Sequence, residues 1–369
     1  MKLLLKVIVL SIATFVSQEG FAAIKPHGAT PEEAAAARET NSSHHREVDF
    51  FEGNGSPHRA PDVNGIRATH SPVPDDHEFA YVLMSGSDDG VQEIRDLRRL
   101  VASNLPANVK LVILTTVDSA ASIRSRYEAW IPANRLILAT DNSSHNENGL
   151  WARDSFPVPV LDNETKTATL VAHDYFRPFD SFKAIAKAVS GQMELRSEVF
   201  VGGNLLADKK GNCFSVDSDR LFDMSPSEIQ AIYGCASIHM LDHVAGIGDV
   251  DEVIKPLGDN TMLTNQASYV DQLKSLGYNV IMLPDAGGEY RTYANTLIVG
   301  KTVFMPAFGT NKDQVATKVY EDLGYKVVPV RSNYMSDQLN GSVHCQTMAY
   351  PAIKKQDLLH GLGLRELAE

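Results

Sequence analysis

The chain has 369 residues, of which 43% are hydrophobic and 22% charged, a balance typical of a folded protein rather than of an extended disordered chain. Its 46 acidic and 34 basic side chains give a formal charge of -12, and no segment is dense in Lys or Arg. Because an acidic surface repels phosphate backbones, nucleic acid is not expected as a partner. The length allows two domains or one large domain built from repeats.

The first segment has the pattern of an export signal. Two lysines precede an apolar stretch at 7–16, and a Gly-Phe-Ala-Ala sequence follows it. We expect a signal peptide over residues 1–23, cleaved after Ala22 or Ala23. The alternative is an uncleaved anchor, although the apolar run is shorter than the ~20 residues that span a bilayer. The mature protein is therefore expected to be secreted or periplasmic, without a membrane partner, where disulfides persist.

Residues 24–76 are rich in His, Pro, Ala, Asn and Glu and have little apolar periodicity. Such a segment buries too little apolar surface to fold, so we predict a disordered leader. Its histidines allow a metal-binding interpretation, but they lack regular ligand spacing, and a solvated tail is favoured.

The three cysteines leave at least one thiol unpaired within the chain. Cys213 and Cys235 could form a disulfide, which would leave Cys345 free. A free thiol is what a cysteine nucleophile requires. The alternative is three buried, reduced cysteines.

After residue 77, short β-rich segments alternate with amphipathic helical segments. The predicted strands are 79–84, 109–116, 135–139, 170–175, 279–283 and 326–330. The predicted helices are 91–105, 120–130, 181–189, 225–233, 269–276 and 312–323. A ββαβ cadence recurs about every 50 to 60 residues, which favours an α/β fold of radially repeated units over one doubly wound sheet.

Five short stretches concentrate residues suited to catalysis. They are Trp151-Ala-Arg-Asp154, Gly202-Gly-Asn204 with Asp208 and Gly211, Gly248-Asp-Val-Asp-Glu252, Tyr293-Ala-Asn295 and Gly341-Ser-Val-His-Cys-Gln-Thr347. Each alone is weak, because such residues are common in turns, ion pairs and cores. In this order they resemble the guanidino-group-modifying enzymes, specifically the peptidylarginine deiminases and agmatine deiminases, over roughly residues 80–351. The last stretch is the most specific, because it is similar to the nucleophile strand of the peptidylarginine deiminases.

The resemblance implies the pentein fold, a five-bladed α/β propeller of repeated ββαβ units with the active site on its axis. Residues 77–369 would then be a deiminase catalytic domain. No cofactor or metal is expected, and the oligomeric state is not indicated.

The resemblance also implies roles for particular residues. A guanidinium is a planar cation that carboxylates bind bidentately, and Asp154 and Asp251 match the family's clamping positions. We expect Cys345 to attack the guanidinium carbon, so that ammonia leaves and water hydrolyses an S-alkylthiouronium to citrulline. Asn295 would position the thiolate or a substrate nitrogen. Trp151 and Asn204 complete the predicted substrate-binding set.

Simpler structural roles stay open for two of these residues. Asp154 could form an ion pair with the adjacent Arg153 or cap a helix, and Asn295 could belong to a turn. His344 is expected to be structural, because neighbouring side chains on a strand point to opposite faces.

The sequence departs from the family at residue 249. The family has a catalytic His two residues before the second clamping Asp, whereas this chain has Asp249. Strand alternation would place Asp249 and Asp251 on one face, and crowding by carboxylates would raise the pKa of Asp249 enough for acid/base catalysis. The other interpretations are a catalytically impaired guanidinium-binding relative and an engineered substitution.

Export favours an arginine-containing peptide or protein as the substrate, and agmatine or free arginine is the alternative. All three present the same head group, so residues that bind it cannot distinguish them. Arg177, Arg291 and Arg331 are candidates for contacts with a substrate carboxylate.

Overall fold

The computed structural model describes residues 69–88, 90–140, 150–172, 193–195, 201–221, 224–244, 246 and 248–368. The predicted signal peptide, the leader as far as residue 68 and the predicted helix 181–189 lie outside these residues. Within the described ranges, no helix has both the length and the apolar character needed to cross a membrane.

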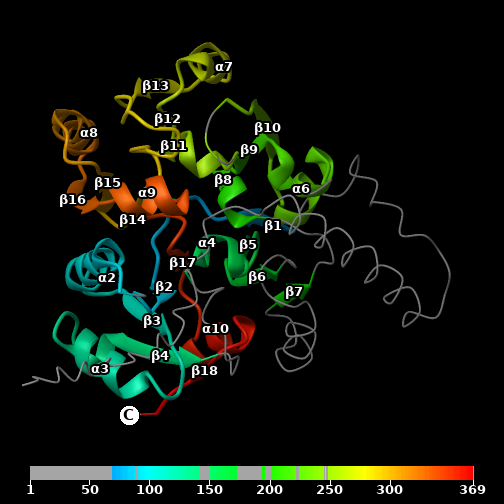
Figure 1. Cartoon of the computed structure of the whole chain (residues 1–369). Coiled ribbons are helices and arrows are strands. Elements are labelled where there is room, and N and C mark those ends of the chain that lie inside the picture. The colour runs from blue at the N-terminus through cyan, green and yellow to red at the C-terminus, as the bar shows by residue number, and fades with distance from the viewer. Residues whose placement is uncertain are drawn as a thin grey trace, which may run out of the picture.

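Four of the five sheets in the described part of the chain share one strand pattern (Figure 1). An antiparallel pair is followed by a third strand that lies parallel to the second. The strands are β5 (Val158–Asp162), β6 (Ala168–Ala172) and β7 (Met193–Leu195); β8 (Leu206–Ala207), β9 (Asn212–Asp217) and β10 (Ser237–Asp242); β11 (Ile254–Leu257), β12 (Thr261–Thr264) and β13 (Asn279–Met282); and β14 (Leu297–Val299), β15 (Thr302–Ala307) and β16 (Lys326–Arg331). In Figure 1 the sheets follow one another around the middle of the molecule.

The fifth sheet joins the two ends of the fold. Its order is β17 (Met348–Tyr350), β2 (Tyr81–Ser85), β3 (Lys110–Leu114), β4 (Leu136–Thr140) and β18 (Arg365–Glu366). β17 is antiparallel to β2, and β2 is parallel to β3, so this sheet contains the same pattern with its first strand taken from the C-terminal part of the chain.

The predicted leader ends earlier than residue 76. β1 (His70–Pro72) pairs antiparallel with β5, and Asp75 is buried beside Lys255. Both partners are far away in the sequence, so the local composition of residues 69–76 could not reveal these contacts.

The helices in the described ranges lie between the strands. They are α2 (Gln92–Asn104), α3 (Ala120–Glu128), α4 (Ala152–Ser155), α6 (Pro226–Tyr233), α7 (Val270–Ser275), α8 (Asn311–Asp322), α9 (Asn333–Leu339) and α10 (Lys355–Gly361). Ser225 and Thr310 form capping boxes at the starts of α6 and α8. Five predicted helices overlap α2, α3, α6, α7 and α8, and the α/β class is confirmed.

The disulfide between Cys213 and Cys235, which the sequence left open, is present. It joins β9 to the segment that follows α6. Cys345 is the free cysteine, as predicted, and its side chain is buried in a cluster with apolar residues of α2, β2 and β3.

Candidate active site

Cys345 lies in a turn between α9 and β17, and its side chain is fully buried. The side-chain amide of Asn295 donates to the Cys345 sulfur at 3.1 Å. The oxygen of the same amide accepts the backbone N–H groups of His344, at 3.0 Å, and of Cys345, at 3.4 Å. Asn295 therefore both fixes the turn that carries Cys345 and contacts the thiol.

The environment of Cys345 favours the neutral thiol. Burial raises the pKa of Cys345 well above its usual range, and the negative charges of Asp251, Glu252 and Asp154 raise it further. A nucleophilic thiolate at this position therefore needs a compensating positive charge or a proton acceptor. Asp251 is placed to be the proton acceptor, because its Oδ2 atom lies 3.8 Å from the Cys345 sulfur.

Asp251 connects the thiol to an imidazole. It belongs to a 3₁₀ helix, Val250–Glu252, and its Oδ2 atom lies 2.6 Å from Nδ1 of His344. The other carboxylate oxygen, Oδ1, is buried and has no hydrogen-bond partner among the described residues. A buried carboxylate oxygen without a donor is unusual, and a guanidinium N–H is the kind of group that would satisfy it.

The expectation that His344 faces away from the chemistry is wrong. It assumed a strand, whereas residues 343–346 form a turn. In this turn the neighbouring side chains of His344 and Cys345 both contact Asp251.

Asp75 holds the other side of the imidazole, a role that was not predicted from the sequence. Its Oδ2 atom lies 3.1 Å from Nε2 of His344 and 2.6 Å from Nζ of Lys255. Burial acts to raise the pKa of Asp75, but the charges of Lys255, His344 and Arg153 outweigh it and hold that pKa well below its usual range. Two carboxylates thus flank the imidazole, one at each ring nitrogen, and hold the ring in place.

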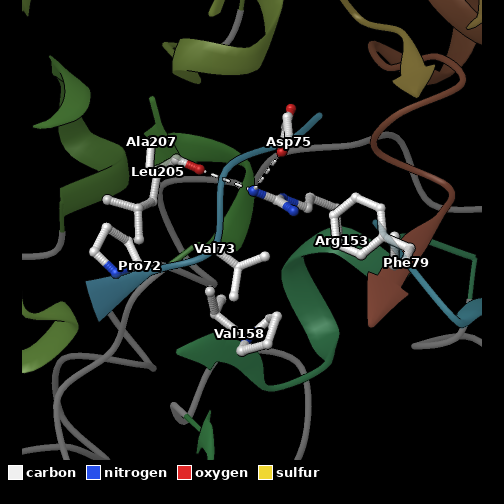
Figure 2. A pocket seen from close by; sticks show the side chains of 10 residues that line it. Pro72, Val73, Asp75, Phe79, Arg153, Val158, Leu205 and Ala207 are labelled. Carbon is white, nitrogen blue, oxygen red and sulfur yellow. Dashed lines mark hydrogen bonds and ion pairs between the residues drawn. The ribbon is translucent and has the colours of Figure 1, made fainter. Parts of the chain in front are cut away.

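A small pocket lies against Asp75. It is lined mainly by apolar side chains of β1, β5 and β8, with Arg153 and Asp75 as its charged residues. Figure 2 shows the Arg153 guanidinium between Asp75 and the backbone oxygen of Leu205. Arg153 also donates to the backbone oxygen of Gly202, so its guanidinium is committed to these groups and to Asp75 rather than to the adjacent Asp154.

The predicted clamp requires Asp154 and Asp251 to bind a substrate guanidinium between them. In the structure Asp154 already binds a guanidinium of the same chain, that of Arg220. One terminal nitrogen of Arg220 donates to Oδ2 of Asp154 at 3.0 Å. The same guanidinium binds both oxygens of Asp249, through Nε at 2.9 Å and through the terminal nitrogen at 3.0 Å. All three side chains are almost completely buried.

The predicted acid/base role of Asp249 does not fit this geometry. Residue 249 precedes the 3₁₀ helix and is extended, so strand alternation does not relate it to Asp251. Asp249 faces Arg220, whereas Asp251 faces His344 and Cys345. Both oxygens of Asp249 accept N–H bonds from Arg220, so this carboxylate is directed at Arg220 rather than at the Cys345 thiol.

The Gly202-Gly203-Asn204 stretch lies against the ion pairs that Arg220 forms with Asp154 and Asp249. A Cβ atom on Gly202 would lie 2.1 Å from the backbone oxygen of Arg153, and one on Gly203 would lie 2.9 Å from Oδ2 of Asp249. The amide of Asn204 bonds to both backbone groups of Val216 and to the backbone N–H of Val250. Asn204, predicted to bind substrate, thus has a positioning role that joins β9 to the segment carrying Asp249 and Asp251.

The other residues that the sequence singled out take part in core packing, turns or ion pairs. Trp151 is buried in the apolar cluster that also contains Cys345, and its backbone oxygen accepts from the first turn of α4. Asp208 and Gly211 form the turn between β8 and β9. Arg291 pairs with Asp337 and Arg331 with Glu93, while Arg177 lies outside the described residues.

Known structures share this fold. A Porphyromonas gingivalis protein provisionally named an arginine deiminase is 19% identical, with a TM-score of 0.60, and the match covers 76% of this chain and 98% of that one. The agmatine deiminase of C. jejuni is 16% identical, with a TM-score of 0.61 over 77% of this chain and 96% of that one. The agmatine deiminase of Enterococcus faecalis is 14% identical, with a TM-score of 0.59 and the same coverage.

The sequence comparison points to the same group. Residues 253–351 match the family model of the Porphyromonas-type peptidyl-arginine deiminases. No curated protein matches the chain closely enough to count as a relative. The fold is thus that of these solved deiminase structures, and the predicted resemblance to the guanidino-group-modifying family is confirmed.

Proposed function

We propose that the chain is a secreted peptidylarginine deiminase, which hydrolyses arginine side chains to citrulline and ammonia. The observation that carries the proposal is the buried cluster around Cys345. In this cluster the free thiol of Cys345 contacts the side-chain amide of Asn295 and one carboxylate oxygen of Asp251. The other oxygen of Asp251 has no hydrogen-bond donor among the described residues. The five sheets, each with the same three-strand pattern, are proposed to be the five blades of a pentein propeller.

The reaction begins when the substrate guanidinium donates to Oδ1 of Asp251. The cation offsets the negative charge around Cys345, so the thiol can pass its proton to Oδ2 of Asp251. The thiolate adds to the guanidinium carbon and forms a C–S bond. One substrate nitrogen then takes up the proton, the C–N bond breaks and ammonia leaves, which gives an S-alkylthiouronium.

Hydrolysis of this intermediate completes the cycle. Water attacks the same carbon, the C–S bond breaks, and a proton released by the water restores the thiol. The products are citrulline and ammonium, and Asp251 carries the proton in both half-reactions. His344 is proposed to position Asp251. It would thereby replace in part the imidazole that the family has at the position of residue 249.

The substrate class follows from the predicted export of the chain. A protein outside the cytoplasm meets arginine in peptides and proteins, and the proposal therefore names these as substrates. Agmatine and free arginine have the same head group and remain the alternative.

Arg220 supports a second candidate function. Its guanidinium contacts Asp154 and Asp249, so a substrate meets a carboxylate that is already neutralised. A chain in which Arg220 never leaves would be a relative of the deiminases that does not turn over substrate.

Parallel assays separate these functions. Ammonia release is measured with an arginine-containing peptide, agmatine and free arginine at equal concentrations, and citrulline is measured in the same samples. We expect the peptide to react fastest. Faster release from agmatine or free arginine would contradict the peptide assignment, and no release from any of the three would contradict the deiminase and favour the second candidate.

A further inference from the structure

We infer that Arg220 occupies a guanidinium-binding site of its own chain, and that a substrate reaches Asp154 only when Arg220 releases it. Arg220 thus competes with the substrate for one carboxylate. The assignment rests on the proposed function for the identity of the substrate. The binding of a guanidinium by these carboxylates can be measured without any turnover.

The contacts of Arg220 have the geometry expected for a bound substrate. Two carboxylates, Asp154 and Asp249, hold one planar cation through three N–H bonds of 2.9 to 3.0 Å. Both carboxylate side chains have a relative exposure of 0%, and that of Arg220 is 5%. Such burial removes competing water, so the two negative charges require a cation in this place.

The backbone is shaped around the same carboxylates. The N–H of Gly203 donates to Oδ1 of Asp154 at 3.2 Å. A Cβ atom on Gly203 would lie 3.1 Å from that oxygen and 2.9 Å from Oδ2 of Asp249. The two carboxylates can therefore converge on one guanidinium only because residue 203 lacks a side chain.

Arg220 binds Asp249 and Asp154 unequally. Asp249 receives two N–H bonds in a fork, whereas Asp154 receives one. Leaving Asp154 therefore gives up less than leaving Asp249. A competing guanidinium would take Asp154 first, and Arg220 would stay with Asp249.

Asp154 and Asp251 both act on the thiol, since the charges of both raise the pKa of Cys345. A cation bound to the open oxygen of Asp251 would lie close to the nucleophile, because the other oxygen of that carboxylate is 3.8 Å from the Cys345 sulfur. On this assignment, Asp249, which stands where the family has a His, binds Arg220 and holds it in place.

Guanidinium rescue of Arg220→Ala tests the assignment. The full chain is heated with guanidinium chloride at low millimolar concentration, and with sodium chloride or tetramethylammonium chloride at the same concentration. The melting temperature of Arg220→Ala is expected to rise with guanidinium only. The matched control is Arg291→Ala, which breaks a forked Arg–Asp pair with Asp337 at the surface and is expected to show no such rise.

Arg220→Lys covers the case in which Arg220→Ala does not fold. Lysine keeps the positive charge but lacks the planar fork, so it holds Asp154 less firmly. We expect this variant to bind agmatine and an arginine-containing peptide about tenfold more tightly than the wild type, by calorimetry. Equal or weaker binding in the lysine variant, or equal guanidinium shifts in Arg220→Ala, Arg291→Ala and the wild type, would overturn the assignment.

These outcomes are distinct from failure of the proposed function. Guanidinium rescue in a protein that releases no ammonia would leave the Arg220 site standing and reject the deiminase. Ammonia release without guanidinium rescue or tighter binding would support the deiminase and reject the Arg220 site.

Discussion

Cys345→Ser is expected to abolish the release of citrulline and ammonia while leaving the protein folded. A serine hydroxyl can still accept the Asn295 amide, so the turn keeps its main contact. It is a far weaker acid than a thiol, and the surrounding carboxylates already raise the pKa of the thiol. The hydroxyl would therefore not ionise to form the nucleophile. The measurement is citrulline formation, with circular dichroism to verify the fold.

Ser336→Ala is the control for this substitution. Ser336 is buried in α9, which precedes the turn, and its hydroxyl has no hydrogen-bond partner in the described part of the chain. Turnover is expected to be unchanged, because no donor or acceptor is left alone. Full activity in Cys345→Ser would reject the proposed nucleophile.

Arg220→Leu is expected to lower the free energy of unfolding by about 3–5 kcal/mol at neutral pH. The leucine fills much of the space, but it removes the guanidinium that contacts the two buried carboxylates of Asp154 and Asp249. The measurement is urea unfolding of the full chain. The expected loss is smaller in acid, where the two carboxylates can be protonated.

Arg291→Ala again provides the comparison, because it removes an ion pair of the same geometry at the surface. Its side chain and that of Asp337 are 22% and 36% exposed, so water screens the pair. The expected change is within about 1 kcal/mol. Equal losses in the two variants would contradict the view that Arg220 neutralises a buried pair of acids.

The sequence pointed to several of the residues that lie around Cys345, because they belong to recognisable motifs. Cys345 and Asn295 are 50 residues apart, and the structure joins them through the predicted amide contact. The disulfide was left open, since spacing alone does not determine which cysteines pair. The predicted helices were also reliable, because α2 and α8 are long enough to show their period.

The errors arose where a contact depends on distant parts of the chain. Arg220 lies outside every motif, and only the fold brings it to Asp249, 29 residues later. Asp75 follows a segment whose composition indicates disorder, yet Lys255 binds it across 180 residues. The roles of Asp249 and His344 were misjudged because strand alternation was applied to a 3₁₀ helix and a turn.

Very short strands were missed for a different reason. β8 has two residues and β14 has three, which is too few to display a period of two. Pairing with a neighbouring strand, rather than local preference, defines such elements.

The central claim is that the sulfur of Cys345 bonds to the guanidinium carbon of the substrate. Rapid acid quenching of the wild-type protein with an arginine-containing peptide, followed by digestion and mass spectrometry, tests it directly. The account predicts that the fragment with Cys345 gains the mass of the substrate minus ammonia during the first turnover. Citrulline that accumulates while Cys345 stays unmodified, or an adduct on another residue, would contradict it.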